Sequence, residues 1–283
     1  MSGAWWHPAG DSEGPLIMGI LNLTPDSFSD GGRYLAPEQA LAHGLRMAEE
    51  GADIIDVGGE STRPGAEPVP AAEQCRRVLE VIRALRAQLP DGVRISIDTS
   101  LGEVATAAVR AGADMLNDVS AGRDDPGIFA LAANRGLPLV LMHMRGTPRT
   151  MQEAPRYDDV VEEVRQFLLG RVRAAVAAGV PEEQLVLDPG IGFGKTVEHN
   201  LALLRGLRRL ATLGCPLLLG ASRKRFMQAA CGTVAGAELV GATCATTALG
   251  VWQDVRIFRV HDVRANRQAA ALSWRLRQCA AGA

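Results

Sequence analysis

Eight polar side chains, each following a short apolar run, could together bind a charged heterocyclic substrate. They are Asn22, Asp56, Asp98, Asn117, His143, Asp188, Ser222 and His261. The oxygens and amides of Asp98, Asn117 and Asp188 suit the edge of a guanidine-like ring, where an unmatched buried partner costs about 1–3 kcal/mol. Arg63, Arg259 and His261 are suited to holding a doubly charged anion. This set predicts a site for a ring that carries a phosphate-like group.

Lysine is almost absent from the chain, although basic residues are not. Of 30 basic residues, only Lys195 and Lys224 are lysines. A compact ammonium on a flexible stem cannot be imitated by a planar guanidinium, so a chain that otherwise uses arginine should retain lysine where the ammonium is needed. We expect a functional role for Lys224, which lies beside Ser222, whereas function and chance are equally open for Lys195.

Two long polar segments follow the first two apolar runs. Residues 22–32 are rich in turn formers and too long for a simple connection, and such loops are commonly functional lids or disorder. Residues 56–66 place small residues around Arg63, whose guanidinium can grip phosphate oxygens in a bidentate fork. We expect two loops, residues 23–33 and residues 61–70, to close over a bound substrate.

The apolar runs themselves predict parallel strands. They are rich in Val, Ile and Leu and hardly alternate, which is typical of strands buried on both faces. The runs cover residues 16–21, 52–55, 93–97, 113–116, 137–142, 184–187, 216–220 and 255–260.

Helix-like stretches separate these runs, and glycines mark where several of them should end. A left-handed residue is expected just past a helix, where only glycine turns freely. Asp158 should cap the longest helix, and one apolar stripe should include Leu201 and Leu204 together with Leu207 and Leu210. The glycines expected at helix ends are Gly51, Gly112, Gly136, Gly179 and Gly214.

Eight strand and helix units predict an α/β fold, a (β/α)₈ TIM barrel. A doubly wound open sheet would also alternate strand and helix, but eight units and a length of 283 residues favour the barrel. We expect an N-terminal extension over residues 1–15 and a single barrel domain over residues 16–283. In such barrels the loops after the strands build the active site, so the eight polar residues should meet at one rim.

Composition argues against several classes of protein. A hydrophobic content of 47% is spread over short runs, which predicts no membrane span, and a net charge of −2 provides no footprint for nucleic acid. Residues 1–15 lack the basic and apolar regions of a signal peptide, so we expect a cytoplasmic protein. Five scattered cysteines without a Cys-x-x-Cys pair support neither a disulfide framework nor a thiolate zinc site.

Several long motifs resemble the dihydropteroate synthase family, in order, from about residue 16 to the last helix. The resemblance implies a (β/α)₈ barrel that forms a homodimer and is a target of sulfonamides. It also implies a transferase of folate synthesis, which condenses 6-hydroxymethyl-7,8-dihydropterin diphosphate with 4-aminobenzoate to give 7,8-dihydropteroate and diphosphate. In that reaction the C–O bond breaks to a pterin cation before the amine attacks. The segments that carry the resemblance are 18–32, 53–66, 96–99, 117–122, 141–144, 187–195 with 199–200, 220–226 and 259–263.

The resemblance also implies roles for individual residues. The implied pterin pocket is Asp98, Asn117, Asp188 and Lys224, with Arg259 against the ring. The implied diphosphate site is Asn22, Arg63, Arg259 and His261, with Mg²⁺ held by Asn22 and diphosphate oxygens. The implied aminobenzoate pocket is Phe28, Thr62, Pro64, Phe193 and Ser222, beside Lys224. The catalytic set would be Asp98, Lys224, Arg63, Arg259 and His261.

Three other functions remain open from the residues. The chain could be a methyltetrahydrofolate-type methyltransferase, although such enzymes have no need of the grip that Asn22, Arg63 and His261 suggest. It could be a paralogue that binds pterin without catalysis, although no motif residue departs from the family pattern. From the residues without the resemblance, Lys224 could be the Schiff-base amine of a class I aldolase.

Overall fold

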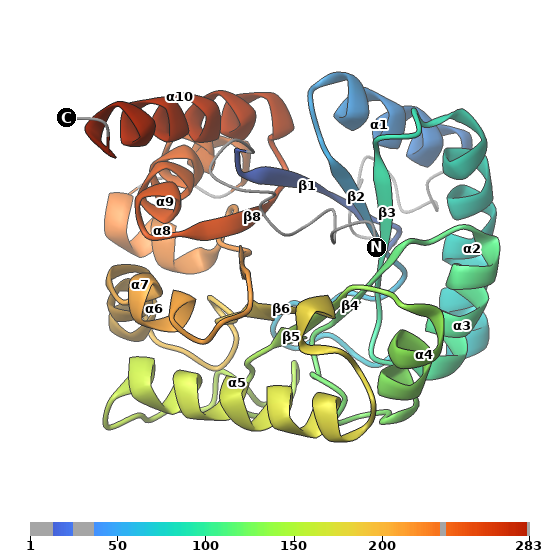
Figure 1. The fold of residues 1–283 in the computed structure, drawn as a ribbon, viewed down its shortest axis with the longest axis horizontal. Coiled ribbons are helices and arrows are strands. Elements are labelled where there is room, and N and C mark those ends of the chain that lie inside the picture. The colour runs from blue at the N-terminus through green and yellow to red at the C-terminus, as the bar shows by residue number, and fades with distance from the viewer. Residues whose placement is uncertain (1–13, 25–36, 233–235, 282–283) are drawn as a thin grey trace.

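Eight parallel strands close into a barrel. The computed structural model describes residues 14–24, 37–232 and 236–281. Each strand pairs with the next along the chain, and β1 pairs with β8, so the predicted barrel is confirmed and the open sheet is excluded (Figure 1). The strands are β1 (Leu16–Asn22), β2 (Ile54–Gly58), β3 (Arg94–Asp98), β4 (Met115–Asp118), β5 (Leu139–Met142), β6 (Leu185–Asp188), β7 (Leu217–Leu219) and β8 (Val255–Val260).

Helices surround the barrel on its outside, and short 3₁₀ turns cover Glu182–Gln184 and Gly236–Leu239 (Figure 1). The helix over residues 240–252 packs against β8, and the helix over residues 263–281 packs against β1. These two helices also pack on each other. The helices are α1 (Pro37–Glu49), α2 (Ala71–Gln88), α3 (Gly102–Ala111), α4 (Gly127–Arg135), α5 (Val160–Ala177), α6 (Val197–Arg205), α7 (Leu207–Ala211), α8 (Arg225–Cys231), α9 (Val240–Trp252) and α10 (Val263–Ala281).

The strands bury both of their faces, which explains why their residues hardly alternate between apolar and polar. Side chains on one face fill the barrel interior, and those on the other face pack against the helices. The interior cluster is fully buried and consists of Met18, Ile54, Met115, Val140, Val186, Leu218 and Ile257. Polar side chains that continue the inward-facing pattern toward the strand ends therefore meet above an apolar floor.

The residues expected at helix ends are largely confirmed. All five glycines expected to turn left-handed do so, with φ of 97° at Gly51, 119° at Gly112, 63° at Gly136, 92° at Gly179 and 89° at Gly214. The cap expected at Asp158 is displaced by one residue. Asp159 caps α5, because its carboxylate accepts from the backbone N–H groups of Val161 and Glu162 at 3.0 Å.

The apolar stripe predicted from Leu201 to Leu210 is partly wrong. Leu201 is 42% exposed, whereas Leu204, Leu207 and Leu210 are buried. The helix breaks at Gly206, where a Cβ would lie 2.8 Å from Val161 Cγ2 of α5. The backbone thus approaches α5 closely at this glycine, and α7 starts a new helical register after it.

Residues 1–13 of the expected extension lie outside the described residues. Just before β1, the Pro15 carbonyl accepts from Arg267 Nη1 at 3.1 Å. This bond holds the start of β1 against α10. All five cysteines are free thiols. Among the described helices, none has the length and apolar character needed to span a membrane.

Candidate functional site

Strand register brings the first group of predicted site residues together. Asn22 pairs with Gly58, Gly58 with Asp98, and Asp98 with Asn117, across β1 to β4. A Cβ at Gly58 would lie 3.3 Å from Asn22 Oδ1 and 3.5 Å from Asp98 Cβ. Glycine at this position therefore leaves room between the amide of Asn22 and the carboxylate of Asp98.

Arg259 of β8 joins two buried carboxylates across the barrel. Its Nε donates to Asp56 Oδ2 at 2.6 Å, and its Nη2 donates to Asp98 Oδ2 at 2.8 Å. Asp56 is fully buried and Asp98 is 8% exposed, so this cluster lies in a medium of low dielectric constant. Arg259 thereby supplies the positive charge that two buried carboxylates require.

Burial dominates the electrostatics of Asp98. Loss of water raises the pKa of Asp98 to about 7, and the nearby carboxylate of Asp56 adds to this rise, although Arg259 opposes it. The two carboxylates in turn raise the pKa of Arg259, against the effect of burial. Asp98 can therefore change its protonation state near neutral pH, and a cation close to it would favour the ionised form.

The opposite side of the rim comes from the segments after β6 and β7. Asp188 Oδ1 accepts from the Gly190 N–H at 2.7 Å, while burial raises the pKa of Asp188. A Cβ at Gly220 would lie 3.6 Å from Asp188 Oδ2 and 4.0 Å from Arg259 Cβ, which places these two side chains on either side of Gly220. Asp188 thus belongs to the same cluster as Arg259.

Lys224 extends along this side of the cluster. A Cβ at Gly192 would lie 3.1 Å from Lys224 Cδ, and Lys224 Nζ lies 4.0 Å from the centroid of the Phe193 ring. Burial, followed by the charge of Arg259, lowers the pKa of Lys224 to about 8. An ammonium over an aromatic face is stabilised by cation–π attraction, so Phe193 helps to hold the Lys224 side chain in place.

His261 and Ser222 form a pair at the same rim. The His261 backbone N–H donates to Ser222 Oγ at 3.2 Å, and Ser222 Oγ lies 3.0 Å from His261 Nδ1. Burial and then Arg223 lower the pKa of His261 to about 3. The imidazole is therefore neutral near pH 7, so one ring nitrogen carries a proton and the other is an acceptor. His261 therefore adds no positive charge to the rim near neutral pH.

The segment after β2 carries Thr62, Arg63 and Pro64. Arg63 and Pro64 are exposed, but Arg63 lies close enough to Lys224 and His261 to lower the pKa of both. The Gly65 N–H donates to the Pro148 carbonyl at 3.1 Å, so this segment contacts the segment after β5. Phe28, the remaining residue of the predicted aminobenzoate pocket, lies outside the described residues. Residues 25–33 of the first predicted lid also lie outside them.

Sequence reasoning left two buried groups without a role. Asp56 is one of the eight polar residues that end the apolar runs, and no motif in the sequence indicates its function. Lys195 is 3% exposed, and its Nζ lies 2.9 Å from each of His143 Nδ1, the Gly190 carbonyl and the Phe193 carbonyl. Its three donors hold the segment that carries Phe193, so its retention as lysine was the one available signal.

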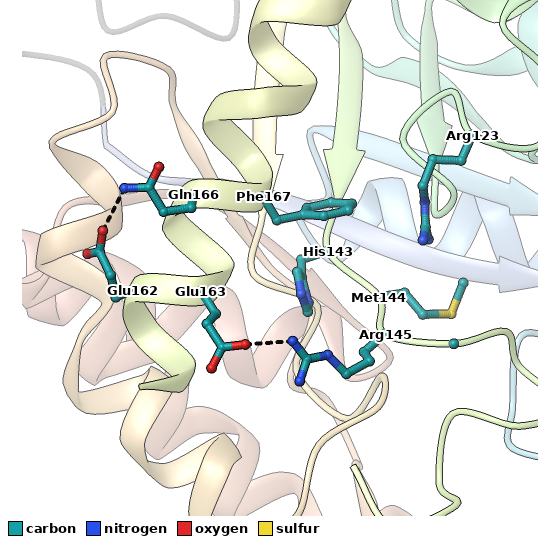
Figure 2. A pocket seen from close by; sticks show the side chains of 9 residues that line it. Arg123, His143, Met144, Arg145, Glu162, Glu163, Gln166 and Phe167 are labelled. Carbon is teal, nitrogen blue, oxygen red and sulfur yellow. Dashed lines mark hydrogen bonds and ion pairs between the residues drawn. The ribbon is translucent and has the colours of Figure 1, made fainter. Parts of the chain in front are cut away.

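A separate cavity of about 450 Å³ lies between the segment after β5 and helix α5 (Figure 2). Two hydrogen bonds join lining residues: Arg145 Nη2 donates to Glu163 at 2.6 Å, as an ion pair, and Gln166 Nε2 donates to Glu162 at 2.7 Å (Figure 2). His143, one of the eight polar residues predicted to meet at the rim, lines this cavity, and its Nδ1 lies 2.9 Å from Lys195 Nζ. The lining residues are Arg123, His143, Met144, Arg145, Gly146, Glu162, Glu163, Gln166 and Phe167.

The rim cluster can bind a flat heterocycle and an anion together. Buried carboxylate and amide groups of β3, β4 and β6 offer hydrogen bonds to a ring edge, and Lys224 with Arg259 supplies positive charge beside them. His261 and Arg63 extend the set of donors toward the outside of the barrel. The arrangement of buried carboxylates beside Lys224 and Arg259 suits a reaction driven by stabilisation of charge.

Comparisons with known proteins agree with this arrangement. The family model described as pterin binding enzyme matches residues 18–261. The dihydropteroate synthase of Synechocystis sp. is 47% identical over 262 residues, which cover 92% of this chain and 90% of the relative.

Two solved structures extend the likeness to three dimensions. Xanthomonas albilineans dihydropteroate synthase with 4-aminobenzoic acid has a TM-score of 0.87 and 48% identity, and 94% of each chain is covered. The enzyme of the same organism in complex with 7,8-dihydropteroate has a TM-score of 0.83 and 45% identity, again with 94% of each chain covered.

Proposed function

Because this chain belongs to the family of pterin binding enzymes, and within it to the dihydropteroate synthases, we propose that its rim cluster condenses 6-hydroxymethyl-7,8-dihydropterin diphosphate with 4-aminobenzoate. The products are 7,8-dihydropteroate and diphosphate, so the protein is a transferase of folate synthesis. The observation that carries the proposal is the joining of Asp98 and Asp56 by Arg259 within one buried rim, beside Asp188 and Lys224.

The pterin ring is assigned to the buried floor of this cluster. Asp98, Asn117 and Asp188 supply acceptors for its amino and ring N–H groups, and Lys224 supplies a donor for its carbonyl and ring nitrogens. Arg259 flanks the ring from β8. Burial of these groups makes each mismatch costly, by about 1–3 kcal/mol, which favours one orientation of the ring.

The diphosphate is assigned to the outer side of the rim. Arg63 and Arg259 contribute positive charge, and His261 contributes a neutral imidazole, whose Nε2–H donates to the diphosphate when Ser222 donates to Nδ1. Charge-assisted hydrogen bonds to the oxygens would strengthen as the diphosphate departs with the electrons of the broken C–O bond.

Asn22 fits a role in holding Mg²⁺. Its amide oxygen faces the space left by Gly58, and the described residues include no group of three or more His, Cys, Asp or Glu side chains that could hold a metal. A cation there would take one protein oxygen and complete its shell with diphosphate oxygens and water, which suits Mg²⁺. When bound, Mg²⁺ would neutralise charge on the leaving diphosphate.

The aminobenzoate is assigned to a pocket formed by Thr62, Pro64, Phe193 and Ser222; the predicted contribution of Phe28 lies outside the described residues. The Phe193 ring offers an apolar face, and Lys195 holds the backbone carbonyl of Phe193 through its Nζ. Lys224, which lies over the same ring, supplies a positive charge beside this pocket.

The reaction needs no nucleophile from the protein. The C–O bond of the pterin methylene breaks first, and both electrons leave with the diphosphate. Asp98 in its ionised form stabilises the resulting pterin cation, whose charge favours that ionised form. The amine nitrogen then forms the C–N bond and loses one proton, which water or the released diphosphate accepts. Closure of residues 61–70 would exclude water, which would otherwise capture the cation.

Positional isotope exchange tests this order of bond breaking. The substrate carries oxygen-18 in the bridge between the methylene carbon and phosphorus, and 4-aminobenzoate is omitted. Breaking of the C–O bond before amine attack moves the label into the non-bridging oxygens of the same phosphate in recovered substrate. Recovery of unscrambled substrate from an enzyme that turns over with 4-aminobenzoate would contradict the cationic intermediate.

A homodimer is the second part of the proposal. Large apolar side chains are exposed on the adjacent helices α9 and α10: Leu249 at 40%, Trp252 at 41%, Leu272 at 64% and Leu276 at 53%. Exposed apolar side chains gathered on packed helices are typical of an interface. Light scattering should give the mass of a dimer for the wild type and of a monomer for the Leu272→Glu, Leu276→Glu variant; a monomeric wild type would contradict the proposal. The cytoplasmic location stays a prediction.

A further inference from the structure

Asp56 lies below the rim and has no direct contact with substrate in the proposed function. Strand β2 continues past Asp56 to Gly58, and alternate residues of a strand share one face. Asp56 therefore faces the barrel interior one inward-facing position below Gly58, in register with Ser96 of β3. The carboxylate is fully buried. Its Oδ2 accepts two hydrogen bonds, from Arg259 Nε at 2.6 Å and from Asn117 Nδ2 at 3.0 Å. Such a costly buried charge calls for a reason beyond packing.

The bond from Asn117 determines which way its amide faces. An ionised carboxylate only accepts hydrogen bonds, whereas an asparagine side chain ends in one acceptor oxygen and one donor nitrogen. A reversed amide would place Asn117 Oδ1 about 3.0 Å from Asp56 Oδ2, where two acceptor oxygens repel each other. With the nitrogen held by Asp56, the oxygen of Asn117 is the atom available to a ring at the rim.

The same carboxylate also anchors Arg259 independently of Asp98. Asp56 takes the Nε of the guanidinium, while Asp98 takes Nη2. When a bound substrate takes the hydrogen bonds of Asp98, the bond from Arg259 Nε to Asp56 still holds the guanidinium in place. Asp56 is thus placed to orient two neighbouring groups that face the substrate.

We propose that Asp56 is a positioning and specificity-determining residue, which holds the Asn117 amide with its oxygen toward the substrate and so selects heterocycles that present an amino group there. This inference rests on the assignment of Asn117 to the pterin pocket. A ring with a carbonyl in place of the exocyclic amino group meets an acceptor and is rejected, because buried acceptors that face each other remain unpaired.

The unpaired atoms around Asp56 make a conservative variant possible. Within the described part of the chain, Asp56 Oδ1 and Ser96 Oγ have no hydrogen-bond partner. In Asp56→Asn, the amide oxygen can replace Oδ2 and accept from both Arg259 and Asn117. The new amide nitrogen then takes the place of Oδ1. Position 56 lies in β2, in register with Ser96 of the neighbouring strand β3. This variant keeps the orientation of Asn117, whereas Asp56→Ala releases it.

The test compares two rings that differ at one substituent. Calorimetry measures the binding of 6-hydroxymethylpterin, which carries the amino group, and of 6-hydroxymethyllumazine, which carries a carbonyl there. The proteins are the wild type, Asp56→Asn, Asp56→Ala and Ser96→Ala, the last as a control at the same depth in the barrel. The ratio of the two dissociation constants is the readout, because a general loss of structure weakens both ligands alike.

The wild type, Asp56→Asn and Ser96→Ala should keep their preference for the pterin within about twofold, and Asp56→Ala should reduce it by about tenfold. An unchanged ratio in Asp56→Ala would overturn the proposal, as would loss of the preference in Asp56→Asn or in Ser96→Ala. Should Asp56→Ala fail to fold, Asp56→Asn alone can still refute the proposal. A wild type without any preference would instead contradict the assignment of Asn117 to the pterin pocket.

Discussion

Replacing Asp98 by asparagine should make stability less dependent on pH. The pKa of Asp98 is raised from 3.8 to about 7 by burial and by Asp56. Between these values the folded protein binds a proton that the unfolded chain has released, so a rise in pH favours the unfolded chain. At about 1.4 kcal/mol per pH unit, the interval of a little over three units corresponds to about 4 kcal/mol.

Urea denaturation of the wild type and of Asp98→Asn, from about pH 4 to about pH 8, measures this contribution. In the variant, the amide oxygen of Asp98→Asn can still accept from Arg259 Nη2. The change in the free energy of unfolding that does not depend on pH should therefore be small. The free energy of unfolding of Asp98→Asn relative to wild type should therefore increase with pH, by up to about 4 kcal/mol. It should level off above pH 7.

Ser96→Ala is the matched control for this measurement, because it lies on the same strand and changes no titrating group. Its free energy of unfolding should follow the wild type across the pH range. A difference between Asp98→Asn and wild type that stays constant with pH would refute the reasoning. It would show that Asp98 is already fully ionised in the folded protein at low pH.

Three further predictions follow from the described contacts. Lys195→Met removes three buried hydrogen bonds of 2.9 Å and should lower the free energy of unfolding by about 3–5 kcal/mol in urea denaturation; a loss below about 1 kcal/mol would show that these bonds contribute little. Lys224→Arg keeps the charge but not the compact ammonium beside Gly192, so kcat/KM for condensation should fall at least about tenfold, and near-normal turnover would disprove the role of Lys224. Chelation of Mg²⁺ should abolish condensation, and Asn22→Ala should raise the Mg²⁺ concentration for half-maximal activity; an unchanged requirement would exclude Asn22 as a ligand.

Local patterns in the sequence predicted the fold because they act over a few residues. Runs of buried strand residues and glycines such as Gly112 and Gly136 report backbone geometry directly. The break at Gly206 could not be predicted, since it depends on how closely α5 approaches, through Val161. Leu201 therefore faces solvent, although it continues the apolar stripe of the sequence.

The candidate site was predictable to the level of which residues gather at the rim, but not of how they pair. Arg259 and Asp56 are 203 residues apart, and their contact exists only once the barrel closes. The depth of Asp56 was missed because β2 extends two residues beyond it, through Val57 and Gly58. The neutral state of His261 also depends on burial and on neighbouring cations, which no local pattern reveals.

A condensation assay tests the central claim most directly. Purified protein is mixed with Mg²⁺, dihydropterin diphosphate and 4-aminobenzoate, and dihydropteroate and diphosphate are followed together. The proposed function predicts that both products appear at equal rates and in equal amounts. Binding of the pterin substrate without formation of dihydropteroate would contradict it, and the chain would then bind pterin without condensing it.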